Sequence, residues 1–302
     1  MFKLQGIYAP MACSFESDMG PIALDKIAEN VKKYNQTKLS GIVVMGSNGE
    51  FVFLTHEEKL AFIRTVCENI APDKHVIVGT GCESTAETIQ LCKEAAELGA
   101  DAALVLSPNY YKKAMQTDRV IEQFYNDVAD ASPIPVIIYN MPGNSSINVS
   151  SAISARLAKH PNIIGEKDSG GNITQISETL RDTDPETFSV FAGSTSFLAA
   201  TTFMGGQGGT LALANVMPDE CVRLFELAKA GDLEKAVKAQ KILLAPNAAV
   251  TAQFGIGGLK VALDHVGYYG GAPRKPLLPQ SEENKAKIIA IIDKAKAEMA
   301  AL

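Results

Sequence analysis

The chain has 302 residues, a formal net charge of −6 and an isoelectric point near 5.4. This charge gives no basic surface for nucleic acid or an anionic membrane, and no apolar run reaches the roughly 18 residues that span a bilayer. The N-terminus lacks a charged region followed by an apolar stretch, so we expect a cytoplasmic protein. The length suits two ordinary domains, or one barrel of about 250 residues with an appendage.

Short β-like runs alternate with longer helical ones, which is typical of βα units around a parallel sheet. Two helix starts are indicated by capping boxes, Thr55 with Glu58 and Ser84 with Glu87. Eight βα units in about 230 residues predict an α/β fold, a closed (β/α)8 TIM barrel over residues 1–230. The expected strands are residues 6–11, 41–46, 76–80, 102–107, 135–140, 163–168, 189–193 and 209–214.

Helical periodicity continues beyond the eighth strand. It covers residues 218–230, 233–253, 258–266 and 282–300. No low-complexity linker separates this region from the barrel, so we expect residues 231–302 to form a helical C-terminal domain that packs on the barrel.

Cysteine and histidine give no indication of a metal or disulfide framework. The five cysteines are odd in number and contain no C-x-x-C pair, and the four histidines lie far apart. We therefore expect a mechanism that uses neither a metal ion nor a cofactor.

One strand is expected to end in a lysine, Lys167, followed by Asp-Ser-Gly-Gly. The carboxyl ends of barrel strands are where such folds bind ligands. A neutral lysine there can attack a ketone and form a Schiff base, and burial favours the neutral amine by lowering its pKa. Tyr139 ends the preceding strand and can serve as acid and base. The alternatives are a lysine that only reaches solvent and a tyrosine that only plugs the barrel end.

A glycine-rich turn follows the second strand, with the sequence Gly46-Ser47-Asn48-Gly49-Glu50. Its backbone N–H groups, hydroxyl and amide are suited to holding a carboxylate. Glu50 is expected to anchor the turn or the following helix start rather than to do chemistry.

These motifs, in this order, resemble the dihydrodipicolinate synthase and N-acetylneuraminate lyase family of class I pyruvate aldolases. The resemblance rests on the 46–50 turn, on Tyr139-Asn140-x-Pro142 and on Ile163-Ile164-Gly165-x-Lys167, and it covers essentially the whole chain. It implies a barrel with a helical C-terminal domain, a homotetramer built as a dimer of dimers, and pyruvate or another 2-oxo acid bound as an imine.

The resemblance also assigns roles to residues. Lys167 would form the Schiff base and Tyr139 would shuttle protons. Ser47 would link Tyr139 to Tyr110 of a neighbouring subunit, with Tyr111 as the rival for that position. Ser47 and Asn48 would take the pyruvyl carboxylate.

Departures from the family pattern indicate which enzymes of the family this chain resembles less. Asn144 stands where the synthases usually have an arginine that grips the aldehyde substrate's carboxylate. Gly193-Ser194-Thr195-Ser196 lacks the acidic residues with which sialic-acid lyases bind a polyhydroxy chain. Asn144 and Gly193 remain expected substrate-binding residues.

Further segments resemble the 4-hydroxy-2-oxoglutarate aldolase subgroup. They include Lys167-Asp168-Ser169-Gly170-Gly171, residues 246–256 and Gly267-Tyr268-Tyr269-Gly270-Gly271. By this resemblance Ser169 would hold the distal carboxylate of the substrate. Animal members of the subgroup are mitochondrial, whereas this chain begins almost directly at its first expected strand, which leaves no room for a transit segment.

The resulting hypothesis is reversible cleavage of 4-hydroxy-2-oxoglutarate to pyruvate and glyoxylate. The expected partners are therefore small 2-oxo acids and an aldehyde, not nucleic acid or membrane. Two alternatives stay open: a 4-hydroxy-tetrahydrodipicolinate synthase that condenses pyruvate with aspartate semialdehyde, and a silent barrel that binds a 2-oxo acid and regulates a partner. Glu166 should point out of the barrel, where we expect a hydrogen-bonded or ion-paired partner.

Overall fold

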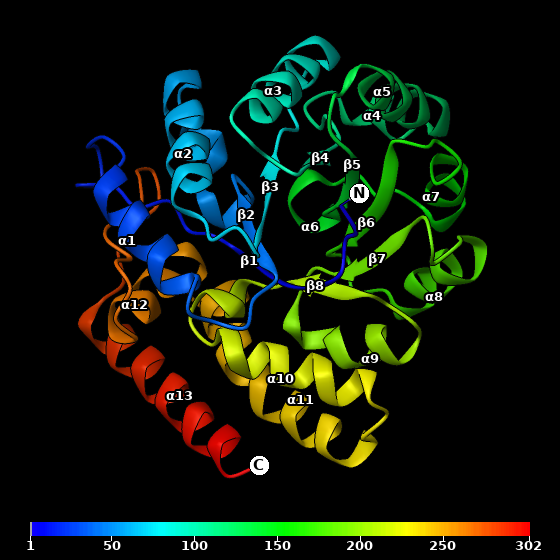
Figure 1. Ribbon diagram of the computed structural model, residues 1–302. Coiled ribbons are helices and arrows are strands. Elements are labelled where there is room, and N and C mark those ends of the chain that lie inside the picture. Colours follow the sequence, from blue (N-terminus) through cyan, green and yellow to red (C-terminus); the bar gives the residue numbers. More distant parts are fainter. Residues whose placement is uncertain (1) are drawn as a thin grey trace.

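Eight short runs of mainly β-branched and small residues form the strands of a closed, all-parallel barrel (Figure 1). The computed structural model describes residues 2–302. Consecutive strands are neighbours, and β8 closes the barrel against β1. The predicted TIM barrel is confirmed. Its strands are β1 Gly6–Pro10, β2 Gly41–Val44, β3 His75–Gly79, β4 Ala102–Leu106, β5 Val136–Asn140, β6 Ile163–Asp168, β7 Ser189–Ala192 and β8 Gly208–Thr210.

The eighth strand is shorter than predicted. We expected residues 209–214, but the extended backbone ends at Thr210, and Ala212–Asn215 form a 3-10 helix, η4. Leu211, Leu213 and Ala214 are nevertheless fully buried. A continuous apolar run does not distinguish a strand from a tightly turned buried segment, which is why the sequence overestimated this strand.

The barrel interior is filled by side chains. Tyr8, Val43, Leu104 and Phe191 belong to one buried cluster inside the strands. Leu4, in the segment before β1, joins this cluster, and the ring of Phe2 meets His75 edge-on at 4.8 Å between centroids. His75 begins β3, so the N-terminal segment closes the end of the barrel at which the strands start. Only the opposite end of the barrel is then open to a ligand.

Helices surround the barrel and cover the outward-facing strand residues in two further apolar clusters (Figure 1). The capping box predicted at Thr55 forms in full, because Thr55 accepts from the Glu58 N–H while the Glu58 side chain accepts from the Thr55 N–H. At Ser84 half of the predicted box forms: the Ser84 side chain accepts from the N–H of Glu87, without the reciprocal bond from Ser84 N–H to the Glu87 carboxylate. These helices are α1 Leu24–Tyr34, α2 His56–Asn69, α3 Thr85–Glu97, α4 Lys112–Met115, α5 Asp118–Ala131, α6 Pro142–Ser145, α7 Ser151–Leu157, α8 Ile173–Asp182, α9 Leu198–Phe203 and α10 Pro218–Lys229.

The last helices pack together at one side of the barrel (Figure 1). They are α11 Leu233–Ala248, a π-helical turn Ala249–Gln253 (η5), α12 Gly255–His265 and α13 Glu282–Ala300. Leu243, Leu259, Ile288 and Ile292 are buried in the same cluster as barrel residues. This packing brings residues beyond 250 close to strand ends.

Candidate active site

Lys167 and Tyr139 occupy neighbouring strands in register. Tyr139 of β5 pairs with Lys167 of β6, near the C-terminal ends of both strands. The Nζ atom of Lys167 lies 4.0 Å from the centroid of the Tyr139 ring. Both residues are buried, at 4 % and 5 % exposure. The structure thus brings the two principal predicted residues together at the end of the barrel where such folds bind ligands.

The Tyr139 phenol is polarised by its surroundings. Burial raises its pKa, but the charge of Lys167 and hydrogen bonding to Ser47, Lys167 and Ser169 act in the opposite direction, so that the pKa lies below its ordinary value. The Ser47 Oγ and Tyr139 hydroxyl oxygen atoms are 3.3 Å apart. A phenol with a lowered pKa gives up and takes back a proton more readily near neutral pH.

The 46–50 turn places Ser47 beside this pair. Ser47–Gly49 form a single 3-10 turn, η1, which starts directly after Gly46 at the end of β2. Ser47 and Asn48 are half-buried, and the Nδ2 atom of Asn48 is a buried donor without a hydrogen-bond partner among residues 2–302. A buried donor without a partner raises the free energy of the folded state, so its position indicates where a ligand oxygen could accept a hydrogen bond.

Asp168 shapes the loop that presents Ser169. Its Oδ1 atom accepts from the N–H groups of Gly170 at 2.8 Å and Gly171 at 3.0 Å, and its Oδ2 atom accepts from Asn140 Nδ2 at 2.8 Å. The sequence reasoning gave Asp168 no role. The signal was available in its position, since an acidic residue that directly precedes a Ser-Gly-Gly turn can accept from the free N–H groups of that turn.

Gly193 approaches the same loop closely. A Cβ atom there would collide with Ser169 Oγ and would lie 2.6 Å from the Asp168 carbonyl oxygen. Gly193 was predicted as a substrate-binding residue, and the geometry gives it a steric task, which is to leave room for Ser169.

Gly193→Ala is expected to destabilise the protein by about 1–3 kcal/mol and to raise KM, because the Ser169 loop must move to admit the methyl group. Urea unfolding and steady-state kinetics measure the two effects. Gly143→Ala is the matched control, since a Cβ at Gly143 has no atom within 4 Å. Equal unfolding free energies for the two variants would contradict the close approach.

Glu166 points away from Lys167, into the layer between the strands and the helices, and it is 1 % exposed. We expected a hydrogen-bonded or ion-paired partner. Within residues 2–302 no cation pairs with Glu166 and its Oε2 atom has no hydrogen-bond partner, which leaves the Ser154 hydroxyl as the polar group beside the carboxyl. Burial, and then the charge of Asp168, raise its pKa from the ordinary 4.5 to about 8, with the Ser154 hydroxyl acting in the opposite direction. A carboxyl group that is mostly protonated at neutral pH needs no cation.

This raised pKa predicts a pH-dependent stability. Below pH 4.5 Glu166 is protonated in both states and its contribution is complete; as the pH rises toward about 8 the unfolded chain releases a proton that the folded chain keeps. Stability is lost over this window by at most about 1.4 kcal/mol per pH unit and levels off above it. Glu166→Gln is therefore expected to remove this loss.

Urea unfolding at about pH 5, 6.5 and 8 tests this prediction, because the advantage of the Glu166→Gln variant over the original protein should grow with pH. Glu186→Gln is the control, since the Glu186 side chain is 81 % exposed. Parallel pH profiles for the original protein and Glu166→Gln would show that Glu166 is ionised in the fold.

Tyr110 and Asn144 lie on the surface of the chain. Tyr110 is 77 % exposed, and its ring meets Tyr111 edge-on at 5.2 Å between centroids. The carboxylate of Glu83 fixes the backbone of this loop by accepting from the N–H groups of Asn109 at 3.1 Å and Tyr110 at 3.0 Å. Asn144 is exposed on α6, just after Tyr139. The structure thus clusters Lys167, Tyr139, Ser47 and Ser169, and leaves Tyr110 and Asn144 outside that cluster.

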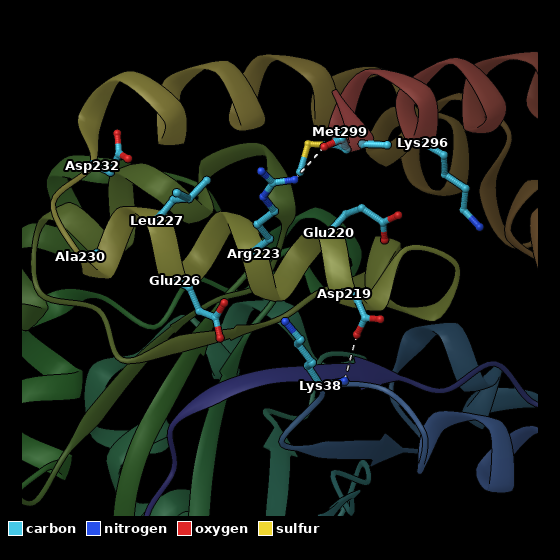
Figure 2. Close-up of a pocket in the computed structure, with 11 residues that line it drawn as sticks. Lys38, Asp219, Glu220, Arg223, Glu226, Leu227, Ala230, Asp232, Lys296 and Met299 are labelled. Carbon is cyan, nitrogen blue, oxygen red and sulfur yellow. Dashed lines mark hydrogen bonds between the residues drawn. The ribbon is translucent and has the colours of Figure 1, made fainter. Parts of the chain in front are cut away.

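A groove of about 610 Å³ lies elsewhere, between α10 and the end of α13 (Figure 2). Arg223 points toward α13 and donates to the Met299 carbonyl oxygen at 2.8 Å. On the other side of α10, Asp219 accepts from the Lys38 N–H at 2.9 Å (Figure 2). None of the predicted site residues lines this groove, so its size does not make it a rival for the chemistry.

Residues 2–302 contain no group of three or more His, Cys, Asp or Glu side chains placed to hold a metal ion. Over the same residues, no helix has both the length and the apolarity needed to cross a membrane.

Lys260 and Arg274, both from the C-terminal region, contact Glu50 of the 46–50 turn. The sequence analysis identified neither residue. Lys260 Nζ lies 2.8 Å from Glu50 Oε1, and both side chains are 1 % exposed. The Arg274 N–H donates to Glu50 Oε2 at 2.8 Å. The expectation that Glu50 anchors the turn agrees with these contacts. One signal was present in the sequence: Lys260 is the single charge in the apolar run Gly255–Leu263.

Comparison with known proteins shows the family of the chain. Residues 3–295 match the model of the dihydrodipicolinate synthetase family. A relative from Emericella nidulans, named "Probable 4-hydroxy-2-oxoglutarate aldolase, mitochondrial", is 39 % identical over 290 residues, which cover 94 % of this chain and 92 % of that protein. A relative from Hypocrea jecorina, named "L-threo-3-deoxy-hexylosonate aldolase", is 38 % identical over 285 residues, 90 % of each chain.

A solved structure gives the same result. Dihydrodipicolinate synthase from Bacillus anthracis superimposes with a TM-score of 0.91 at 29 % identity, covering 97 % of this chain and 99 % of that one. The family model spans nearly the whole sequence, and the relatives are matched over most of their length. The chain therefore belongs to the dihydrodipicolinate synthetase family of lyases.

Proposed function

We propose that the chain is a class I aldolase that reversibly cleaves 4-hydroxy-2-oxoglutarate to pyruvate and glyoxylate through an imine on Lys167. The observation that carries this proposal is the buried pair of Lys167 and Tyr139, with the amine 4.0 Å from the ring and the phenol 3.3 Å from Ser47. A nucleophilic amine beside a polarised proton donor is the combination that imine chemistry requires.

Imine formation begins when the neutral Lys167 amine attacks the C2 carbonyl carbon of the substrate. Tyr139 protonates the carbonyl oxygen as the C–N bond forms, takes a proton from the amine nitrogen, and passes it to the same oxygen, which leaves as water; Tyr139 is then the phenolate. The product is a protonated imine, which acts as an electron sink. Ser47 stays within reach of the phenol throughout and can return protons to it.

Cleavage then requires a base for the 4-hydroxyl group. The Tyr139 phenolate takes that proton, the C3–C4 bond breaks, glyoxylate leaves, and the electron pair enters the imine to give an enamine. Protonation at C3 and hydrolysis by water release pyruvate and restore Lys167. The lowered pKa of Tyr139 supports this role, because it makes the phenolate accessible nearer neutral pH.

The substrate has two carboxylate groups, and each must be bound by residues of the site. We assign the C1 carboxylate to the 46–50 turn, where Asn48 has an unpaired buried donor, and the distal carboxylate to Ser169. The absence of an arginine at position 144 favours a small aldehyde product over aspartate semialdehyde.

Two other substrates have specific support. Dihydrodipicolinate synthase of Bacillus anthracis shares the fold, which keeps condensation of pyruvate with aspartate semialdehyde as an alternative. The name of the Hypocrea jecorina relative points to a six-carbon deoxy acid. For such a chain, the hydroxyls of Ser194 and Ser196, which both accept from Asn247 Nδ2, are polar groups beyond Gly193.

A substrate panel separates these candidates. Pyruvate release from 4-hydroxy-2-oxoglutarate and from a six-carbon 3-deoxy-2-oxo acid is followed with a coupled reductase, and consumption of aspartate semialdehyde is followed with pyruvate present. The proposal expects the highest kcat/KM on 4-hydroxy-2-oxoglutarate. Pyruvate binding without turnover of any of the three would instead support a regulatory binding protein.

We also propose that Tyr110 acts in the site of a second copy of the chain, within a homotetramer. Its 77 % exposure and its fixed backbone support this assignment, because an exposed aromatic pair on an anchored loop is suited to a subunit interface. The mass of the protein in solution tests this proposal, because a homotetramer has four times the mass of one chain. The cytoplasmic location stays a prediction, and the Emericella nidulans relative is named as mitochondrial.

A further inference from the structure

The 46–50 turn is bracketed by two residues with left-handed backbone conformations. Met45 has φ 58° and Glu50 has φ 52°, and each is 2 % exposed. Residues other than glycine rarely adopt positive φ, and such residues persist only where the surrounding structure holds them. The conformation of Ser47 and Asn48 between them therefore depends on contacts at both ends of the turn.

Direct backbone packing holds the first end. A Cβ atom on Gly79, at the end of β3, would lie 2.8 Å from the Met45 carbonyl carbon. The glycine lets the backbone of β3 approach Met45 more closely than any other residue would permit. This contact stays within the barrel and needs no side chain.

One side chain and one backbone N–H from the far end of the sequence hold the second end. The Glu50 Oε1 atom forms an ion pair with Lys260 Nζ at 2.8 Å, and Oε2 accepts a hydrogen bond from the backbone N–H of Arg274 at 2.8 Å. Lys260 in turn donates to the Ala272 carbonyl oxygen at 2.7 Å, and its Nζ lies 4.6 Å from the centroid of the Phe15 ring. The buried amine is thus fixed on three sides.

Arg274 is held just as firmly. Its guanidinium binds both carboxylate oxygens of Glu58 at 2.6 and 2.7 Å and donates to the carbonyl oxygens of Phe53 at 3.0 Å and Gly20 at 2.7 Å. It also lies 4.1 Å from the centroid of Phe15. Glu58 belongs to the capping box of α2, so Arg274 joins the turn, the start of α2 and the loop between β1 and α1 into one unit.

We infer that Lys260 and Arg274 are positioning residues, which hold the 46–50 turn in the strained conformation that presents Ser47 and Asn48 to the substrate carboxylate. The inference rests on the proposed function for the identity of that ligand. It assigns the C-terminal region a task in substrate binding, although neither cation contacts Lys167 or Tyr139. The competing interpretation is a buried ion pair that contributes only to stability.

The double variant Glu50→Gln with Lys260→Met tests the inference. Removing one partner alone would leave an uncompensated buried charge and could prevent folding, whereas the double change removes both charges at similar volume. Loss of the charged contacts is expected to raise the pyruvate concentration for half-maximal borohydride trapping on Lys167 by about tenfold or more. A purely structural role would lower the unfolding midpoint and leave this concentration unchanged.

Lys74→Met is the matched control. Lys74 is also a buried lysine, at 8 % exposure, and its Nζ donates to the carbonyl oxygens of Thr37 at 2.8 Å and Leu39 at 2.7 Å, close to the strand starts. This variant is expected to unfold more easily while the half-saturating pyruvate concentration stays the same. A rise as large as that of the double variant would overturn the inference, because general destabilisation would then explain both.

A crystal structure of the double variant supplies a readout that needs no ligand. We expect residue 50 to leave the left-handed region and Ser47 to move away from Tyr139. An unchanged turn would overturn the inference whatever the kinetics show. Failure of the original protein to trap pyruvate would contradict the proposed function instead, and the position of the turn would still decide between positioning and stability.

Discussion

Lys167→Met is expected to lower kcat by about four orders of magnitude or more, because no other group in the cluster can form the imine that accepts the electron pair. The side chain is 4 % exposed and ends beside the Tyr139 ring, so methionine fills a similar volume and the fold should persist. Borohydride with pyruvate should modify the original protein at residue 167 and leave the variant unmodified, as judged by peptide mass.

The control for this prediction is again Lys74→Met, which removes a buried lysine from the opposite end of the barrel and should retain turnover. Normal trapping of pyruvate by the Lys167→Met protein would mean that another amine forms the imine, and the mechanism would then need a different centre. Circular dichroism shows whether each variant is folded. Loss of turnover in a folded Lys167→Met protein, with turnover retained in Lys74→Met, would assign the loss to the missing amine and not to unfolding.

Tyr139→Phe is expected to reduce kcat by about 10²–10⁴-fold while some pyruvate is still trapped. The phenylalanine ring keeps the packing against Lys167 but has no hydroxyl to move protons between the substrate oxygen and Ser47. Steady-state kinetics on 4-hydroxy-2-oxoglutarate, compared with single-turnover trapping, separate loss of proton transfer from loss of binding.

Ser47→Ala provides the matched comparison for Tyr139→Phe. It removes the partner of the phenol, at 3.3 Å, but leaves the phenol itself in place. Its loss in kcat should be smaller than that of Tyr139→Phe. Normal turnover in Tyr139→Phe would remove the tyrosine from the mechanism, whatever the effect at Ser47.

Much of the fold follows from local patterns. Seven of the predicted strands lie where the structure has them, within a residue or two at each end, because alternating short apolar runs and capped helices report on the local conformation directly. The eighth strand was misjudged at Ala212–Asn215, where a buried 3-10 turn carries the same apolar residues that a strand would. The apolar residues of this segment predicted its burial correctly but did not predict its backbone conformation.

The centre of the candidate site was also readable. Lys167 and Tyr139 end consecutive strands, and in a parallel barrel the ends of consecutive strands are neighbours, so their proximity follows from order along the chain. Glu166 shows the limit of such reasoning. Alternation correctly placed it outside the barrel, but only its burial, at 1 % exposure, indicates a neutral acid without a cation beside it.

Residue type and spacing along the chain indicate which groups are available for chemistry, namely an amine, a phenol and a hydroxyl at strand ends. What holds these groups in place depends on the tertiary structure. The Glu50 carboxylate meets Lys260 and the backbone of Arg274 because α12 and the loop after it fold back onto the barrel. A contact between residues more than 200 positions apart depends on the packing of the whole chain, and no local pattern around position 50 encodes which cation will arrive there.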